Sequence, residues 1–141
     1  MTRSITALIV AAHNHASAEA LGDIDAILAT MEGEPVYDFY PVGRRFSGMD
    51  RTRRYYRHFV DNVMPRIAGY QLHQEWLGEG GVVQEYSVDV RDESGDGLTR
   101  HRILGILTFG EALLSGERLY ADEAFFRILI GPIWDELEPI A

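Results

Sequence analysis

The stretch from His101 to Asp122, HRILGILTFGEALLSGERLYAD, is the longest apolar segment of the chain that a turn interrupts. Two nearly continuous apolar runs, residues 103–109 and 112–120, flank the sequence Phe-Gly-Glu-Ala at 109–112, and this pattern predicts a β-hairpin. Strands this apolar are typical of the middle of a sheet, where other elements cover both faces. We therefore expect the hairpin to form the centre of a sheet that other elements close over.

Helical periodicity marks the beginning of the chain. Apolar residues at positions 5, 8, 12 and 16 share one face of a helix that breaks at Leu21-Gly22. A shorter helix starts at Asp23 and ends in the sequence Glu-Gly-Glu-Pro at 32–35, because proline cannot continue it. Residues 36–41, VYDFYP, predict a strand with Asp38 and Tyr40 on one face, and residues 43–46 predict a loop.

A third helix and two further strands precede the hairpin. Ser47 and Asp50 have the spacing of a capping box, and the apolar positions 56, 59, 60 and 63 predict a helix that Pro65 ends. Residues 70–76 and 82–90 predict strands joined by the turn Gly-Glu-Gly-Gly at 78–81. Asp122 is placed to cap a last short helix, which Gly131-Pro132 closes.

These elements make one domain over residues 1–141, in the order helix, helix, strand, helix, four antiparallel strands, helix. Such an order predicts an α+β fold, with the helices packed on one side of a curved, mixed, mostly antiparallel sheet. A chain of this length buries a core without disulfides or metals to hold it together.

Composition excludes several classes of chemistry. The absence of cysteine rules out disulfides, thiol nucleophiles and cysteine-ligated metal sites, and all 13 basic residues are arginine, which rules out a Schiff-base lysine. The formal charge of −9 disfavours nucleic acid, so the arginine-rich residues 44–57 are expected to form ion pairs or a rim for an anionic ligand. The first residues contain no membrane-spanning or leader-like segment, and we expect a cytoplasmic protein that binds no membrane.

Three strings resemble the nuclear transport factor two-like superfamily, within it the SnoaL-like polyketide cyclases and the ketosteroid isomerases. They are GDIDAIL at 22–28, PVGRRFSGMDRTRRYYRHF at 41–59 and GERLYADEAFF at 116–126. The resemblance implies a cone-shaped fold, α-α-β-α-β-β-β-β-α, around a blind apolar pocket. It also implies a homodimer formed through the outer sheet face, a small hydrophobic ligand and no cofactor.

The resemblance also suggests roles for individual residues. The isomerases donate a hydrogen bond from a tyrosine seven residues before the glycine that ends the first helix, and His15 stands at that place. The supporting tyrosine of the family matches Tyr56. The general base of the isomerases precedes a Pro-Val-Gly, where Tyr40 stands here, and the nearest carboxylate on that strand face is Asp38. His15, Asp38 and Tyr56 are therefore the predicted catalytic residues.

Two positions depart from the family pattern. Gly105 stands where the isomerases have a second oxyanion donor, and Leu119 lies near the place of an acid in the cyclases and epoxide hydrolases. Steroid isomerase activity is therefore not predicted.

Each candidate has a structural alternative. His15 lies in the apolar stripe of its helix, so its imidazole needs a hydrogen-bond partner, and it is either a site residue or a satisfied core histidine. Asp38 could be a base with a raised pKa or could pair with Arg44 or Arg45. No metal site is predicted, because a His-x-His pair on a helix directs its two rings apart.

Four more residues are predicted to contact the ligand. Tyr40 could supply a pocket hydroxyl, Tyr86 alternates with its neighbours as a lining residue does, and His101 lies on the strand face that the family turns toward its pocket. Tyr120 alternates with Glu117 and Leu119, and the sequence leaves open which of the two faces looks inward.

Two hypotheses of different classes follow. The first is a cofactor-independent enzyme of the isomerase, cyclase or hydrolase type, which performs acid-base chemistry on an apolar, carbonyl-bearing molecule. The second is a non-catalytic, dimeric protein that binds a hydrophobic ligand. The first requires His15 and either Asp38 or Tyr40 to face one shared cavity.

Overall fold

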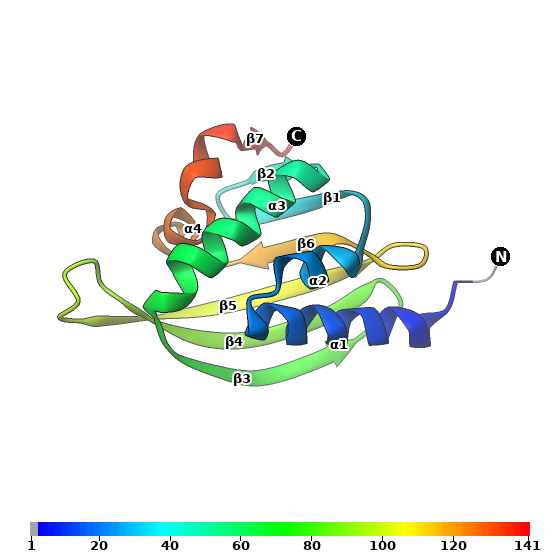
Figure 1. The fold of residues 1–141 in the computed structure, drawn as a ribbon, viewed down its shortest axis with the longest axis horizontal. Helices are drawn as coiled ribbons and strands as arrows, with labels where there is room; N and C mark the ends of the chain where they lie inside the picture. Colours follow the sequence, from blue (N-terminus) through cyan, green and yellow to red (C-terminus); the bar gives the residue numbers. More distant parts are fainter. Residues whose placement is uncertain (1–2) are drawn as a thin grey trace.

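The computed structural model describes residues 3–141, which form an α+β domain with helices on one face of a curved sheet (Figure 1). The helices and strands have the following bounds: α1 (Ile5–Leu21), α2 (Ile24–Ala29), β1 (Met31–Tyr40), β2 (Arg44–Ser47), α3 (Met49–His58), β3 (Ile67–Leu77), β4 (Gly81–Arg91), β5 (Leu98–Phe109), β6 (Leu114–Tyr120), α4 (Glu123–Ile130) and β7 (Glu138–Pro139). A π-helical turn, Phe59–Val63, and a 3-10 turn, Met64–Arg66, continue α3 toward β3.

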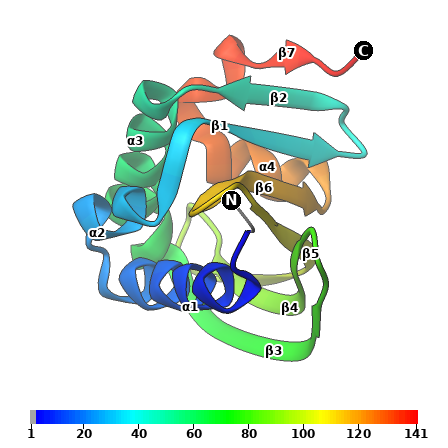
Figure 2. The same ribbon diagram turned by 90° about the vertical axis from the view of Figure 1, so that its right-hand side faces the viewer.

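The predicted hairpin lies at the centre of the sheet. The strand order is β3-β4-β5-β6-β1-β2-β7, so β6 is the middle strand. β1 pairs with β6 in parallel, whereas the other neighbours are antiparallel. In Figure 2 the sheet curls from β2 to β3, and α1, α2 and α3 lie on the concave side of the curve.

The prediction that both faces of the hairpin are covered is wrong for the described residues. The concave face of β5 is buried at Ile103, Leu107 and Phe109, whereas Leu104 and Ile106 on the convex face are only half-buried. The helices of the described chain cover the concave face alone.

Long-range contacts change two predicted boundaries. β1 begins at Met31, because the carboxylate of Glu32 accepts hydrogen bonds from the backbone of the hairpin turn, at 3.1 Å each from Ala112 N and Leu113 N. The predicted loop 43–46 is instead occupied by β2, which pairs with β1.

The predicted capping box does not form. Gly48 is the N-cap residue of α3, and it provides no side-chain hydrogen bond to the first turn of the helix. The carboxylate of Glu34 instead accepts a hydrogen bond from Met49 N at 3.0 Å. By contrast, Asp122 caps α4 as predicted and accepts a hydrogen bond from Phe125 N at 2.8 Å.

Aromatic side chains fill the narrow end of the cone, between β1, β2, α3 and α4. The rings of Tyr37 and Phe46 stack with centroids 4.9 Å apart, and Phe39 meets Phe126 edge-on at 5.2 Å. Such ring pairs stabilise the fold through burial and quadrupole contacts. This end of the interior is solid, which leaves the wide end over β3 to β6 to hold the cavity.

Candidate active site

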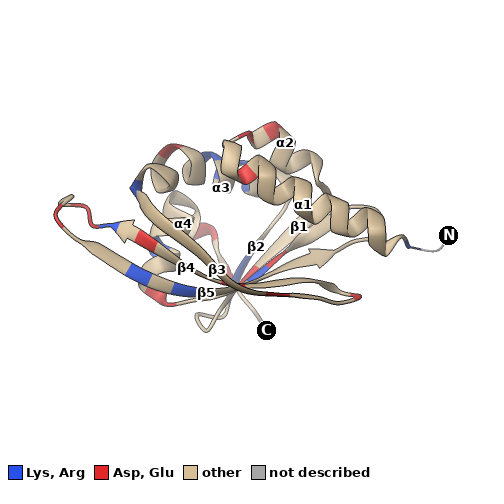
Figure 3. Cartoon of the chain, turned by 90° about the horizontal axis from the view of Figure 1, so that it is seen from below, with Lys and Arg blue, Asp and Glu red and all other residues tan. Residues whose placement is uncertain are grey.

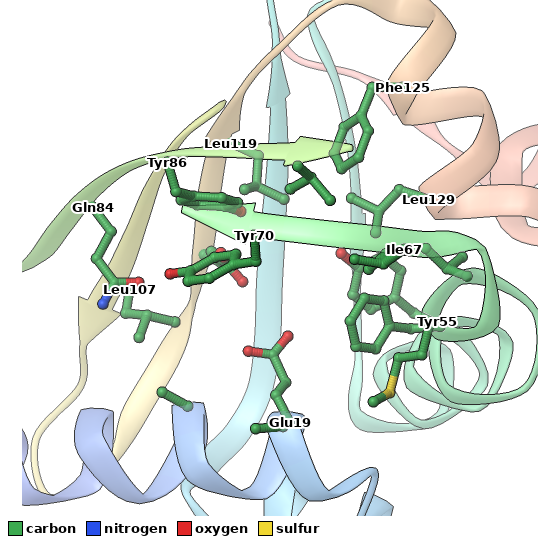
Figure 4. A pocket seen from close by; sticks show the side chains of 17 residues that line it. Glu19, Tyr55, Ile67, Tyr70, Gln84, Tyr86, Leu107, Leu119, Phe125 and Leu129 are labelled. Carbon is green, nitrogen blue, oxygen red and sulfur yellow. The ribbon is translucent and has the colours of Figure 1, made fainter. Parts of the chain in front are cut away.

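A cavity of about 520 Å³ lies between the concave face of β3 to β6 and the helical layer. Its walls come from α1, α3, the turns that follow α3, the four strands and α4, and most of its lining side chains are apolar or aromatic. The volume is in the range of small-molecule sites. Figure 4 shows Glu19 rising from α1 into this space, opposite Tyr70 and Tyr86 on the sheet.

Two carboxyl groups face the cavity, Glu19 from α1 and Glu117 from β6. Burial raises the pKa of Glu19 to about 7. Burial raises the pKa of Glu117 well above its ordinary value, and the charge of Glu19 raises it further. A third of the Glu19 side chain is accessible, and because Glu19 lines the cavity this accessible part contacts the space that a ligand would fill.

The pairing of β6 with β1 and β5 turns Glu117 inward. Glu117 stands beside Tyr37 on one side and Leu107 on the other, both of which are on the concave face. Gly105 leaves room for the carboxyl group, because a Cβ atom there would lie 3.2 Å from Glu117 Oε1. Glu117 and Leu119 therefore face the cavity, while Arg118 and Tyr120 face outward.

His15 belongs to a buried chain of hydrogen bonds whose direction can be assigned. Thr30 donates its hydroxyl hydrogen to Ile27 O at 2.6 Å, so it accepts from His15 Nδ1 at 2.9 Å. Burial lowers the pKa of His15 to about 4, so the ring is neutral near pH 7 and its Nε2 accepts from Tyr56 at 3.1 Å. Tyr56 in turn accepts from Tyr37 at 2.6 Å.

These hydrogen bonds leave His15 without a hydrogen to donate toward the cavity. Its single N–H is used by Thr30, and neither His15 nor Tyr56 lines the cavity. His15 is thus buried with both ring nitrogens hydrogen-bonded, as the alternative of a core histidine requires. Glu19 lies close to these hydrogen-bonded residues, with its Oε2 atom 3.8 Å from His15 Nε2.

Asp38 and Tyr40 lie on the opposite face of β1 from the cavity, so the requirement that they share it with His15 is not met. Asp38 accepts two hydrogen bonds from Arg45, at 2.8 and 3.1 Å, because the β1–β2 register sets the two residues side by side. The ring of Tyr40 stacks on that of Tyr120 at 5.2 Å, and neither tyrosine lines the cavity.

His101 and Tyr86 were also predicted to contact the ligand. His101 Nδ1 lies 2.6 Å from Asp122 Oδ2, and its ring packs against Phe125 at 5.1 Å, so it ties β5 to the start of α4. His101 does not line the cavity, whereas Tyr86 does. The ring of Tyr86 lies 5.5 Å from that of Tyr70, and burial raises the pKa of Tyr86 well above its ordinary value.

Sequence reasoning missed Glu19 and Glu117 as site residues. The signal for Glu19 was present, because this carboxylate lies on the same helical face as Leu8 and His15. Glu117 was assigned correctly to the face of Leu119, but only the strand pairing decides that this face points inward.

Residues 3–141 contain neither a cluster of metal-ligating side chains nor a membrane-spanning helix. No three histidine, aspartate or glutamate side chains of that range come together as they would around a metal ion. No helix in the described part of the chain is long and apolar enough to cross a membrane.

Comparison with solved structures places this architecture among known folds. No protein-family model and no curated protein sequence matches the chain. An NTF2-like protein of unknown function from Cytophaga hutchinsonii aligns with a TM-score of 0.65 and 13% identity over 80% of this chain and 97% of that one. An LEH-like epoxide hydrolase of M. tuberculosis aligns with a TM-score of 0.64 and 20% identity over 89% and 90%.

A fungal protein, PrhC from Penicillium brasilianum, aligns with a TM-score of 0.62 and 16% identity over 94% of this chain and 92% of its own. Identities this low report on the fold and leave activity open. The chain adopts the nuclear transport factor two-like fold.

Proposed function

We propose that the protein is a SnoaL-like, cofactor-independent enzyme that carries out acid-base chemistry on a small apolar, carbonyl-bearing molecule, with Glu117 as the acid and Glu19 as the base. The observation that carries this proposal is the pair of carboxyl groups in one apolar cavity, both with pKa values that burial raises above the ordinary value. Because a like charge nearby disfavours ionisation of the second group, such a pair can hold one protonated and one ionised carboxyl group, as proton transfer requires.

The reaction that fits this pair is proton transfer at a carbon next to a carbonyl group. Burial and the charge of Glu19 both favour the protonated form of Glu117, which can donate a hydrogen bond to the carbonyl oxygen as negative charge develops there. Glu19, with a pKa of about 7, is partly ionised and can remove the proton from the carbon. The carbon–hydrogen electrons then form the enol double bond, and the oxygen gains its proton from Glu117.

The same two groups could open an epoxide, with Glu117 protonating the ring oxygen and Glu19 activating a water. The structural likeness to an LEH-like epoxide hydrolase makes this a reaction to include in the test. Both reactions need one protonated and one ionised carboxyl group, and both proceed without a metal or an organic cofactor.

The test is exchange of α-hydrogen for deuterium in a panel of alicyclic ketones, followed by NMR, together with diol formation from matching epoxides. Glu117→Gln and Glu19→Gln keep the shape of each side chain and should each lower the rate at least about 100-fold, the usual contribution of a general acid or base. Asp38→Asn is the matched control, because its carboxylate lies on the other face of β1.

Wild-type rates in either glutamine variant would contradict the proposal. Binding of the panel without any turnover would instead support the second hypothesis, a non-catalytic protein that holds a hydrophobic ligand. Protection from thermal unfolding by the same molecules measures that binding directly.

A further inference from the structure

The lining of the cavity is one-sided in charge. Glu19 and Glu117 contribute carboxyl groups, whereas no arginine and no histidine of residues 3–141 lines the space. The nearest imidazole, that of His15, is neutral because burial lowers its pKa to about 4. A negatively charged ligand would meet these carboxyl groups with no positive partner to offset the repulsion.

The two carboxyl groups also have unused acceptor capacity. No hydrogen-bond donor in the described part of the chain serves either of them, and the 3.8 Å separation of Glu19 Oε2 from His15 Nε2 is too long for a hydrogen bond. A buried carboxylate is stable when hydrogen-bond donors or a positive charge satisfy it. No side-chain oxygen of the described residues is both buried and unpartnered, so these carboxyl oxygens are open to the cavity, where a ligand can supply a donor or a positive charge.

Aromatic rings surround the carboxyl groups and supply a second attraction for positive charge. Tyr55, Phe59, Tyr70, Tyr86 and Phe125 all line the cavity. The face of an aromatic ring carries negative charge density and attracts ammonium groups, most strongly where water is excluded. The net charge of −9 adds a field that draws cations toward the molecule.

We infer that the cavity selects its ligands by charge and that an apolar amine is the class it binds most tightly, with the ammonium group between Glu19 and Glu117 and the hydrocarbon body against the aromatic walls. This inference deepens the proposed function, since it names the ligand class of the same site. An amine would pair with the ionised carboxylate that acts as the base, so it competes with a neutral ketone.

The test compares three molecules with one hydrocarbon skeleton: 1-aminoadamantane, 1-adamantanol and 1-adamantanecarboxylate. Their dissociation constants are measured by calorimetry at pH 7.5 in 0.15 M salt, on the full chain. We expect the amine to bind at least about tenfold more tightly than the alcohol, and the carboxylate to bind more weakly than either, from the carboxylate and ring contacts together.

The double variant Glu19→Gln, Glu117→Gln distinguishes the contribution of the cavity carboxyl groups to amine binding from that of the overall negative charge of the protein. It should reduce the difference between amine and alcohol to less than about threefold, since only the ring contacts remain. Asp38→Asn removes one carboxylate elsewhere and should leave the difference unchanged. Both variants are checked for folding by circular dichroism.

Equal binding of amine and alcohol, tighter binding of the carboxylate, or no binding by any of the three would overturn the inference. Retention of the amine preference in the double variant would overturn it as well. These outcomes are distinct from failure of the proposed function, because they measure binding alone. Turnover of a neutral ketone that depends on Glu19 and Glu117 could persist even if the amine preference were absent.

Discussion

Glu117 lies directly over Gly105, and a Cβ atom at position 105 would stand 3.2 Å from Glu117 Oε1 and 3.3 Å from Leu119 Cδ2. The glycine therefore sets where the carboxyl group of Glu117 sits in the cavity. Position 105 is where the resemblance would place an acid on β5. Here the acid comes from the neighbouring strand, and the glycine makes room for it.

Gly105→Ala should displace the carboxyl group of Glu117 with little loss of stability. The new methyl group requires shifts of a few tenths of an ångström, so we expect the free energy of unfolding to fall by about 1 kcal/mol. We expect turnover, or amine binding, to fall at least about tenfold, because a small misplacement of a reacting group is costly. Gly80→Ala is the matched control, since a Cβ atom there meets nothing within 4 Å. Unchanged activity in Gly105→Ala would show that Glu117 does not depend on this gap.

Stability should fall as the pH rises from 6.5 to 8.5. The folded-state pKa values of Glu19, about 7, and of Glu117 lie above the ordinary value of 4.5, so the folded chain holds protons that the unfolded chain has released. Glu19 alone should lower the free energy of unfolding by about 1 kcal/mol across this window, a figure that allows for its contact with cavity water. His15, whose pKa falls from 6.5 to about 4, acts at lower pH and in the opposite sense.

Urea unfolding of the wild type and of the double variant Glu19→Gln, Glu117→Gln at both pH values measures this effect. The difference between the two proteins isolates the carboxyl pair from the other titrating groups. Equal pH dependence in both proteins would mean that the two carboxyl groups are ionised normally in the folded state.

His15→Ala should destabilise the fold and leave the cavity chemistry intact. The substitution removes a fully buried ring, the acceptor for the Tyr56 hydroxyl and the donor to Thr30 Oγ1, which should cost about 3 kcal/mol. Turnover per folded molecule should stay within about threefold, because the imidazole has no hydrogen directed at the cavity. His13→Ala, exposed on the same helix, should change stability by less than about 0.5 kcal/mol. Loss of turnover at unchanged stability would instead restore a catalytic role for His15.

Local patterns were enough to predict most of the elements and the alternation of side chains along them. The hairpin, the helix capped by Asp122 and the opposite faces of Asp38 and Phe39 all follow from residues close in sequence. Which face of a strand points into the cavity depends on pairing between distant segments. The register that sets Tyr37 beside Glu117 turns this carboxyl group inward, and the register that sets Arg45 beside Asp38 keeps that ion pair outside.

The chain should form a homodimer through the convex face of the sheet. Leu104 and Ile106 are half-buried there, and Trp76 on β3 is 47% exposed. Figure 3 shows acidic and basic residues along β4 and β5 toward the end that lies away from the N-terminus. Glu85 of β4 forms an ion pair with Arg102 of β5. Accessible apolar side chains gathered on one face of a sheet are typical of an interface.

Light scattering should therefore give twice the 15.9 kDa mass of the chain for the wild type and the single mass for Leu104→Arg. Leu21→Arg is the control, because Leu21 is 82% exposed at the end of α1 and should not affect association. A monomeric wild type would contradict the homodimer prediction and would leave the proposals for the cavity unchanged.

Asp38→Asn should weaken the fold slightly and leave the cavity unaffected. The carboxylate is held by two hydrogen bonds from Arg45, whose side chain is 40% exposed, so the pair is worth about 1 kcal/mol to the free energy of unfolding. Arg45→Gln should cost a similar amount, and the double variant should cost less than the sum, because both changes remove one interaction. Turnover should match the wild type in all three, since β1 separates this pair from Glu117. A loss of turnover in Asp38→Asn that Arg45→Gln does not share would assign the base to Asp38 and remove the role proposed for Glu19.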